Sequence, residues 1–246
     1  MLRTGVIIAF TLAIELLCLT KVITPFTMPA PHKIVADLFQ ILVSGKLNGA
    51  ILRTLANAAI ACISAIAVGV AVGALIHPLP WIRRMLDPVF STYYAVPVLA
   101  FYPIFVVVFG LGDTPQILTG FMLGFVTVII NTLDGLDRVP PVMKKVARIE
   151  GLGQVRTAFT VALPFAIPYI ATGAKLAVSY SIVGVIAAEF IMSRSGIGYE
   201  IHFAYLNFDN ATMYPMILLL IVVAVVINML VYRYERKLLQ RRGLVQ

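Results

Sequence analysis

Six stretches of this sequence are long and apolar enough to cross a membrane as helices, and they constrain the fold more than any other feature. A helix needs about 20 such residues to cross about 30 Å of hydrocarbon. The apolar–polar alternation of a membrane β-barrel is absent from them. We therefore predict an all-α integral membrane protein with about six transmembrane helices in a single domain of residues 1–246. The cores of these spans run over residues 5–23, 56–76, 89–109, 116–133, 166–192 and 211–232.

The composition agrees with this class and leaves no soluble domain. Hydrophobic residues make up 61% of the chain and charged residues only 12%, which is far from the usual soluble range. His32, His77 and His202 are scattered, and no cluster of carboxylates has the spacing of metal ligands. No nucleophile and base occur at a workable spacing either. We expect neither a bound metal nor an enzymatic activity in this chain.

The distribution of lysine and arginine orients the spans. Basic residues near span ends are retained in the cytoplasm, so we expect both termini and residues 134–164 to be cytoplasmic. The net charge of +8 then reflects topology and contact with anionic membrane lipid, and we expect no nucleic-acid partner. With the N-terminus inside, the cytoplasmic segments hold thirteen of the 19 basic residues: Arg3, Arg83, Arg84, Arg138, Lys144, Lys145, Arg148, Arg156, Arg233, Arg236, Lys237, Arg241 and Arg242.

Two patterns indicate how the spans pack. The second span carries a ladder of small residues at every fourth position, which allows close approach of helices within the bundle; its members are Ala61, Ala65, Gly69 and Gly73. Between the first two spans, apolar residues from Ile34 to Leu42 recur at helical spacing. They predict an amphipathic helix on the outer membrane surface. It either packs against neighbouring spans, which we favour, or contacts an external partner.

A few polar or helix-breaking residues inside the spans are candidates for a translocation path. Two prolines in the third span free backbone carbonyls, which are tolerated beside protein or a water-filled path, so this span is either pore-lining or only kinked. Ionisable groups at mid-membrane cost about 2.5 to 3.5 kcal/mol and tend to face protein or water. The candidates are Pro97, Tyr102, Asn131, Lys175, Ser179, Tyr180 and Glu189.

Lys175 has several interpretations. It could attract an anionic solute, extend its amine to the cytoplasmic surface, or pair with Glu15 or Asp134. We expect Lys175, Ser179 and Gly184 to share roughly one helix face, as a polar strip toward the path.

The polar, basic segment of residues 134–164, called the basic loop below, contains a short amphipathic helix by its spacing. The apolar side is formed by Val146, Ala147, Ile149, Gly151, Val155 and Phe159, and charged residues such as Arg148 and Glu150 flank it. A glycine in mid-helix costs about 1 kcal/mol, so we expect a close contact at Gly151. The inner ends of the spans or a partner must cover the apolar side.

At these residues the chain resembles the inner-membrane permease subunits of bacterial ABC importers that depend on a binding protein. Their cytoplasmic signature reads E-A-A, three residues, G, nine residues, I-x-L-P. Lys145-Val146-Ala147, Gly151, Val161 and Leu163-Pro164 match its spacing, with Lys145 in place of the acidic residue and Val146 in place of an alanine. Other segments resemble the branch that serves nitrate, sulfonates, taurine and thiamine-precursor pyrimidines, among them Met28 to Pro31, Asn131 to Leu136 and Ser195 to Tyr199.

The resemblance implies a type I importer permease in the bacterial inner membrane, paired with a second, usually identical copy. It implies that the basic loop sits in a groove of a separate ATPase subunit, which holds ATP and magnesium, and that a periplasmic or lipid-anchored binding protein delivers the solute. This sequence has no Gly-x-x-x-x-Gly-Lys-Ser/Thr loop for ATP phosphates. The docking residues are then expected to be Val146, Ala147, Arg148, Glu150, Gly151, Val155, Leu163 and Pro164. The alternative is a secondary transporter or channel that acts without an ATPase.

Overall fold

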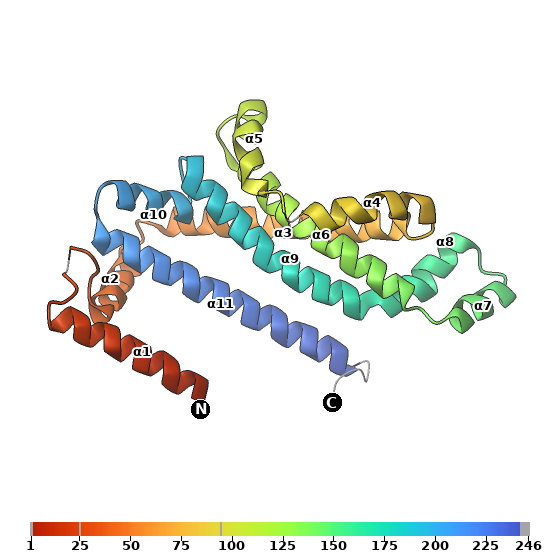
Figure 1. Cartoon of the computed structure of the whole chain (residues 1–246), viewed down its shortest axis with the longest axis horizontal. Helices are drawn as coiled ribbons and strands as arrows, with labels where there is room; N and C mark the ends of the chain where they lie inside the picture. The colour runs from red at the N-terminus through yellow and green to blue at the C-terminus, as the bar shows by residue number, and fades with distance from the viewer. Residues whose placement is uncertain (1, 25, 94, 242–246) are drawn as a thin grey trace. The chain divides into compact units, whose positions relative to one another are not determined.

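The computed structural model describes residues 2–24, 26–93 and 95–241. The remaining residues, Arg242 of the C-terminal basic group among them, lie outside the described residues. All regular structure in the described ranges is helical (Figure 1). In chain order the helices are α1 (Leu2–Leu19), α2 (Pro31–Ser44), α3 (Asn48–Ile76), α4 (Pro80–Tyr93), the 3-10 helix η1 (Val98–Phe101), α5 (Tyr102–Phe109), α6 (Asp113–Asp137), α7 (Pro141–Ile149), α8 (Gln154–Thr157), the π-helix η2 (Ala158–Ala162), α9 (Leu163–Met192), α10 (Ile197–Leu206) and α11 (Asn210–Arg241).

Four of the six predicted spans are confirmed as helical stretches long and apolar enough to cross a membrane. They correspond to the predicted second, fourth, fifth and sixth spans. The helices run beyond the predicted apolar cores, because polar ends continue the same helix: α6 begins at Asp113, and α11 continues to Arg241. The four stretches are Asn48–Ile76, Asp113–Asp137, Gln154–Leu206 and Asn210–Lys237.

The other two predicted spans differ from the expectation of straight helices. Residues 89–109 do not form one helix, because α4 and η1–α5 reach span length only together and are bent by 95° at a break. Pro97 ends the break in an extended conformation, where its missing N–H removes no helical hydrogen bond. In the first span, α1 ends at Leu19 rather than residue 23, since Lys21 adopts a left-handed φ of 60°. Only Ala9–Leu19 of its described residues qualifies as an apolar helix, and it is shorter than a span.

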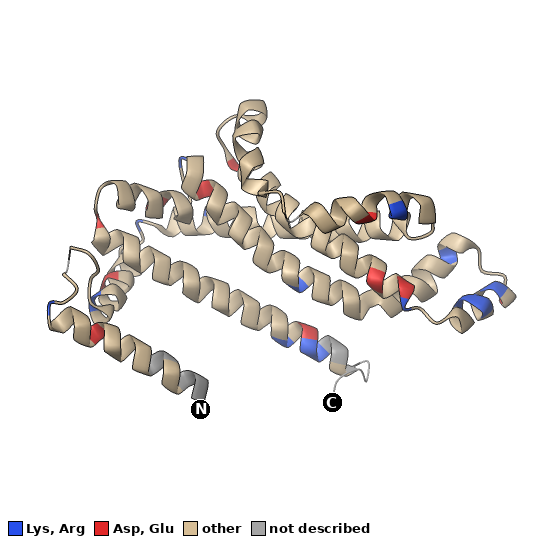
Figure 2. Ribbon diagram, viewed as in Figure 1, with Lys and Arg blue, Asp and Glu red and all other residues tan. Residues whose placement is uncertain are grey.

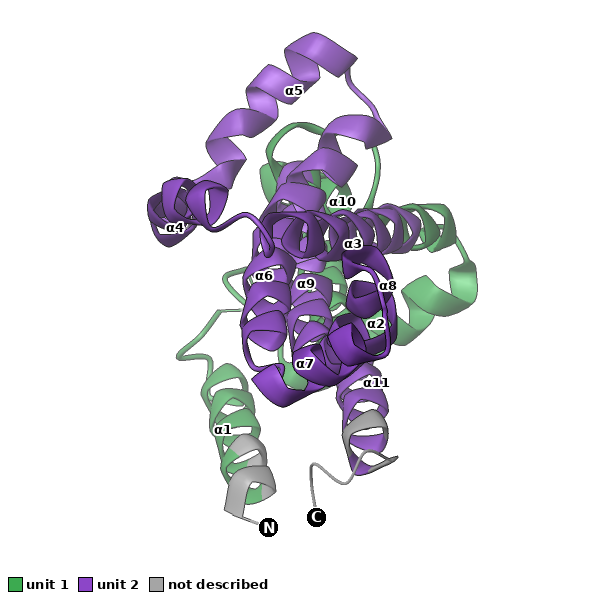
Figure 3. Cartoon of the chain, turned by 90° about the vertical axis from the view of Figure 1, so that its right-hand side faces the viewer, with its two compact units in different colours: residues 1–54, 189–225 green, residues 55–188, 226–246 purple. Residues whose placement is uncertain are grey.

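The chain divides into two compact units, coloured separately in Figure 3. Unit 1 comprises Met1–Thr54 and Glu189–Val225, and unit 2 comprises Leu55–Ala188 and Val226–Gln246.

Unit 2 is organised around the close approach of α6 and α9. A Cβ on Gly184 of α9 would lie 2.7 Å from the Cα of Gly120 of α6, and a Cβ on Gly120 would lie 2.8 Å from the carbonyl oxygen of Ser181. Only two glycines permit backbones to meet this closely. The Ser181 hydroxyl also donates a hydrogen bond of 3.1 Å to the carbonyl oxygen of Gly120. Residue size therefore fixes the register of α6 against α9.

The predicted small-residue ladder of α3 packs against this pair. Ala61 and Ala65 are fully buried, and Ala61 belongs to a core cluster with Ile182 and Val185 of α9. One turn after Ala65, a Cβ at Gly69 would meet Val128 of α6 at 2.6 Å. Close packing of the second span within the bundle is thus confirmed.

Unit 1 has a core of its own, to which α2 contributes one side. The buried cluster is formed by Ile197 and Ile201 of α10 with Met216 and Leu219 of α11, and Leu38 and Ile41 of α2 pack against it. The opposite side of α2 is exposed, including Val35 and Phe39. Packing of this helix against its neighbours is therefore confirmed for Leu38 and Ile41 but not for Val35 and Phe39.

The glycine contact predicts an unequal response to two matched substitutions. In Gly120→Ala the new methyl group has no room beside Ser181 and Val185, and we expect a loss of about 1 to 3 kcal/mol from overpacking. Gly49→Ala adds the same methyl group to a helical glycine with nothing within 4 Å. Thermal unfolding of the detergent-purified protein should show a lower midpoint for Gly120→Ala only. Equal midpoints would contradict the packing argument.

Candidate functional site

Both ends of the basic loop, which belongs to unit 2, are held by packing against each other. Helix α6 continues to Asp137, so residues 134–137 of the predicted loop are helical. Leu136 and Val139 on the entering side form a buried cluster with Ala162 and Ala166 on the leaving side. Leu163 and Pro164 start α9, and Leu163 packs against this cluster. The segment between is therefore presented on a fixed base.

Helix α7 begins and ends with residues suited to those positions. Pro141 occupies the first turn, where the N–H it lacks has no helical partner in any case. At the other end the Leu152 N–H donates to the Ala147 carbonyl oxygen at 2.9 Å and the Gly151 N–H donates to that of Arg148 at 3.1 Å. These two bonds form a Schellman motif. The motif requires a left-handed conformation at the first residue after the helix cap, which is Gly151.

The expected role of Gly151 is therefore wrong in one respect. It lies after the end of α7, not in the middle of a helix, and its φ of +71° explains why glycine stands there. No atom of this chain would meet a Cβ at Gly151 within 4 Å, so the expected close contact is not found within the described residues. The helix stops at Ile149 and a second, shorter one starts at Gln154.

The apolar residues of the loop are divided between its anchor and its free surface. Helix α7 contacts η2, and its Ala147 is 3% exposed, whereas Ile149 is 84% exposed. The apolar side chains of α7, α8 and η2 that are more than half exposed are called the apolar face below: Val142, Val146, Ile149, Val155 and Phe159. Figure 2 shows that α7 and α8 also carry lysines and arginines. Among them Lys145, Arg148 and Arg156 are exposed, as is Glu150.

A charged cluster ties α4 to the base of the loop. Arg83 Nη1 of α4 lies 2.7 and 2.6 Å from the two carboxylate oxygens of Asp137, the last residue of α6. His77 Nε2 approaches the same carboxylate at 3.4 Å. Burial lowers the pKa of His77, the charge of Lys144 on α7 adds to this effect, and Asp137 opposes it. His77 is therefore neutral at pH 7, and Arg83 is the cation that balances Asp137.

Two of the candidate path residues, Lys175 and Ser179, face α11 of the same unit. Lys175 Nζ lies 3.0 Å from Glu235 Oε2, and the hydroxyl of Thr172 donates to the other oxygen of Glu235 at 3.0 Å. Ser179 donates to Asn228 Oδ1 at 2.8 Å. The partner of Lys175 is thus neither Glu15 nor Asp134. Gly184 is not part of the same strip, because nine residues at 100° place it on the opposite side of α9, against α6.

Glu189 is buried inside unit 1 and organises the start of α10. Its carboxylate, 1% exposed, accepts a hydrogen bond of 3.0 Å from the Gly198 N–H. The Thr54 hydroxyl lies 2.9 and 2.8 Å from its two oxygens and itself accepts the Ile197 N–H at 2.8 Å. Any Cβ at Gly196 would overlap this carboxylate. The acidic group compensates the free N–H groups of a helix N-terminus, as expected from the helix dipole.

The remaining path candidates are not gathered into one site. Tyr102 is 1% exposed, whereas Pro97 and Tyr180 are exposed. Asn131 donates to the Thr127 carbonyl oxygen of its own helix at 2.8 Å, and its Cβ faces Gly173 of α9.

Sequence analysis missed several buried polar partners. Asn57 of α3 donates to Asp113 Oδ1 and to Gln116 Oε1, both at 2.9 Å, at the start of α6. Asn57 and Gln116 are nearly fully buried. The signal was available as amides inside apolar segments, which are costly unless hydrogen-bonded. Thr54 and Glu235 were missed because each looks like an ordinary residue at the end of a span.

Comparison with known proteins identifies the class to which this arrangement belongs. A family model for the inner membrane component of binding-protein-dependent transport systems matches residues 65–242. The chain therefore belongs to this family. It is a multi-pass permease subunit of an ABC transporter in the inner membrane, and the ATPase of such a transporter is a separate subunit.

Two relatives indicate the branch of the permease family to which this chain is similar. The chain is 26% identical over 231 residues to the taurine transport system permease protein TauC of Escherichia coli, covering 92% of this chain and 84% of that protein. It is 30% identical over 188 residues to the nitrate import permease protein NrtB of Synechococcus elongatus, covering 72% of this chain and 67% of that protein.

The fold is that of a solved ABC transporter structure. An inward-facing structure of the MetNI methionine ABC transporter superposes with a TM-score of 0.67 at 18% identity, covering 78% of this chain and 95% of the matched one. At this identity the likeness shows the fold alone.

The Glu189 cluster predicts a strong effect of removing one hydroxyl. Thr54→Val leaves the Ile197 N–H without its acceptor and removes one of the donors to Glu189, which we expect to cost about 1 to 3 kcal/mol. Thr92→Val is the matched control, because the Thr92 hydroxyl bonds only to carbonyl oxygens of its own helix at an exposed position. Thermal unfolding in detergent should separate the two variants. A Thr54→Val protein as stable as the control would exclude this role.

Proposed function

We propose that this chain, as a homodimer, forms the translocation path of an ATP-driven importer for a small solute with a sulfonate or nitrate group. The basic loop docks into a groove of the ATPase subunit. The observation that carries the docking proposal is the apolar face on its fixed base.

The apolar face has the properties of a docking surface. Exposed apolar side chains grouped on a polar, basic loop mark an interaction site, and Ile149, Val155 and Phe159 are 84%, 72% and 68% exposed. The base beneath them is tied to α6 and α9 by the buried cluster of Leu136 and Ala166. A push on α7 would therefore act on two membrane helices at once. Such movement would alternate access to the path between the two membrane sides.

The positive charge of the basic loop favours an ATPase groove that is lined by acidic residues. Lys145, Arg148 and Arg156 lie on the same helices as the apolar face and are exposed, so an acidic rim would complement them. Lys145 stands where the family signature has an acidic residue. We therefore propose that the groove residue opposite Lys145 is acidic.

The proposed topology has six spans with both termini and the basic loop in the cytoplasm. Helix α1 is the first span, and α4 with η1–α5 is a broken third span, as irregular backbone in membranes occurs beside protein or water. The distribution of basic residues supports this orientation. A binding protein outside the cytoplasmic membrane would deliver the solute. The exposed Pro97 and Tyr180 are the path candidates whose side chains remain accessible in the single chain.

The solute proposal follows from the relatives, whose names assign them to taurine and nitrate. Taurine carries a sulfonate group. Sulfonate and nitrate are both small oxyanions of strong acids and carry a negative charge at neutral pH. A thiamine-precursor pyrimidine is the competing solute. A secondary transporter or channel without an ATPase is the competing mechanism, and family membership argues against it.

Two glycines of the basic loop offer a matched test of docking. Gly151→Val must adopt a left-handed conformation that costs about 1 kcal/mol or more, which corresponds to about fivefold weaker docking. Gly153 is equally free of neighbours but has φ −63°, which valine tolerates. We expect solute-stimulated ATP hydrolysis by the assembled complex to fall for Gly151→Val and to persist for Gly153→Val. Full coupling in both variants would refute the docking assignment, and uptake by the purified chain without an ATPase would refute the importer mechanism.

The solute class can be tested on the cognate binding protein. Taurine, an alkyl sulfonate, nitrate and an aminopyrimidine would each be titrated in a calorimeter. We expect heat of binding with a sulfonate or with nitrate. Binding of the pyrimidine alone would reject the proposed class while leaving the importer mechanism intact.

A further inference from the structure

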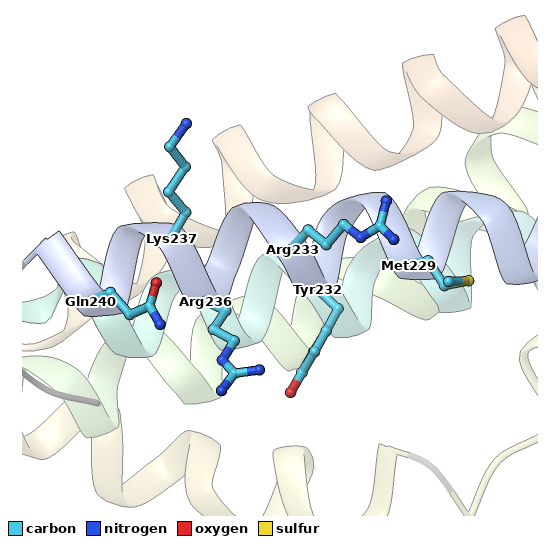
Figure 4. Close-up of a pocket in the computed structure, with 6 residues that line it drawn as sticks. All are labelled: Met229, Tyr232, Arg233, Arg236, Lys237 and Gln240. Atoms are coloured by element: carbon cyan, nitrogen blue, oxygen red, sulfur yellow. The ribbon is translucent and has the colours of Figure 1, made fainter. Parts of the chain in front are cut away.

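The last turns of α11 carry a basic stripe whose function the importer mechanism does not explain. Met229, Arg233, Arg236 and Gln240 follow one another at helical spacing, with Tyr232 and Lys237 on either flank (Figure 4). Together these six residues line a cavity of about 590 Å³. This recess is open to its surroundings, because α11 alone lines it, and it carries three cations, one phenol, one amide and one apolar side chain.

The three cations have no internal counter-charge in the described part of the chain. Glu235 is the only acidic residue between Asn210 and Arg241. Its carboxylate already pairs with Lys175 and accepts the hydroxyl of Thr172, and it is only 10% exposed. Among the described residues, none of Arg233, Arg236 and Lys237 forms an ion pair. Because all three are also exposed, they are available to an external anion.

The position of the stripe along α11 indicates the level of the membrane surface. The apolar stretch Asn210–Lys237 has 28 residues, which is roughly 42 Å of helix. This exceeds a hydrocarbon thickness of about 30 Å, so its last turns lie among lipid headgroups. Tyr232 is a typical residue of that level. Just before it, Met229 and Leu230 are 49% and 57% exposed and would contact acyl chains.

We infer that this recess binds the phosphate-bearing headgroup of an anionic phospholipid. Arg233 and Arg236 donate charge-assisted hydrogen bonds to the phosphate oxygens, and arginine forks suit this geometry. Lys237 adds a third charge, while Tyr232 and Gln240 bond the glycerol part of the headgroup. The adjoining Met229 and Leu230 favour a lipid over a free phosphate ion, because they would pack on its acyl chain.

The experiment uses the purified full-length chain in mild detergent, titrated with a phosphatidylglycerol and a phosphatidylcholine of identical acyl chains, with bound lipid counted by native mass spectrometry. We expect Arg233→Gln/Arg236→Gln to bind phosphatidylglycerol roughly thirtyfold more weakly, which corresponds to about 1 kcal/mol for each arginine near an anionic surface. The double variant Lys33→Gln/Lys46→Gln removes two exposed charges of unit 1 and should bind as the unaltered chain does.

Three results would overturn the inference. Equal binding of phosphatidylcholine would show that the headgroup charge is not recognised. Complete competition by millimolar inorganic phosphate would assign the recess to a free anion. Loss of phosphatidylglycerol binding when the ATPase subunit is added would assign the stripe to an acidic protein surface. Retention of lipid binding in the assembled complex, with the arginine dependence intact, supports a lipid site.

Discussion

The contact between Gly120 and Gly184 is the constraint on which the rest of unit 2 depends. At this point α6 and α9 approach within the distance that only an absent side chain allows, and a Cβ on either residue would overlap backbone atoms. Helix α3 joins them through Ala61, which is fully buried. Lipid provides no hydrophobic drive for helices to associate, so close packing and hydrogen bonds hold them together. The loop that connects α6 to α9 inherits its position from this contact.

Polar groups inside the helices of this chain have partners within the chain itself. Each ionisable residue at membrane depth is a reasonable path candidate, because burial without a partner is expensive. In this structure Glu189 satisfies the N-terminus of α10 and Lys175 satisfies Glu235. Both are therefore explained by the fold of a single chain. A charge that already has such partners contributes little attraction to a passing anion, whereas removing either partner would leave the other charge buried.

Periodicity and hydropathy predicted the helical class, four spans and the close packing of α3, because each depends on local patterns along one helix. They failed where the outcome depends on a partner distant in the sequence. The pairing of Lys175 with a residue sixty positions later on α11 has no local signal. The break before Val98 was visible as Pro97, but the size of the bend depends on how α4 and α5 pack. For the basic loop, the spacing identified Gly151 but placed it in the middle of a helix, whereas it lies after the end of α7.

That correction changes how the motif in the basic loop is understood. A glycine fixed by a close contact with a partner would tolerate any conformation that keeps its surface small. A glycine fixed by a Schellman motif must instead keep its positive φ, because the Leu152 and Gly151 N–H groups cap the last turn of α7 through it. The cap ends α7 immediately after Ile149 and redirects the chain toward Val155 and Phe159. A backbone turn therefore separates the two halves of the apolar face, Val142, Val146 and Ile149 before it and Val155 and Phe159 after it. We infer that the glycine acts on docking through the shape that it gives to the loop.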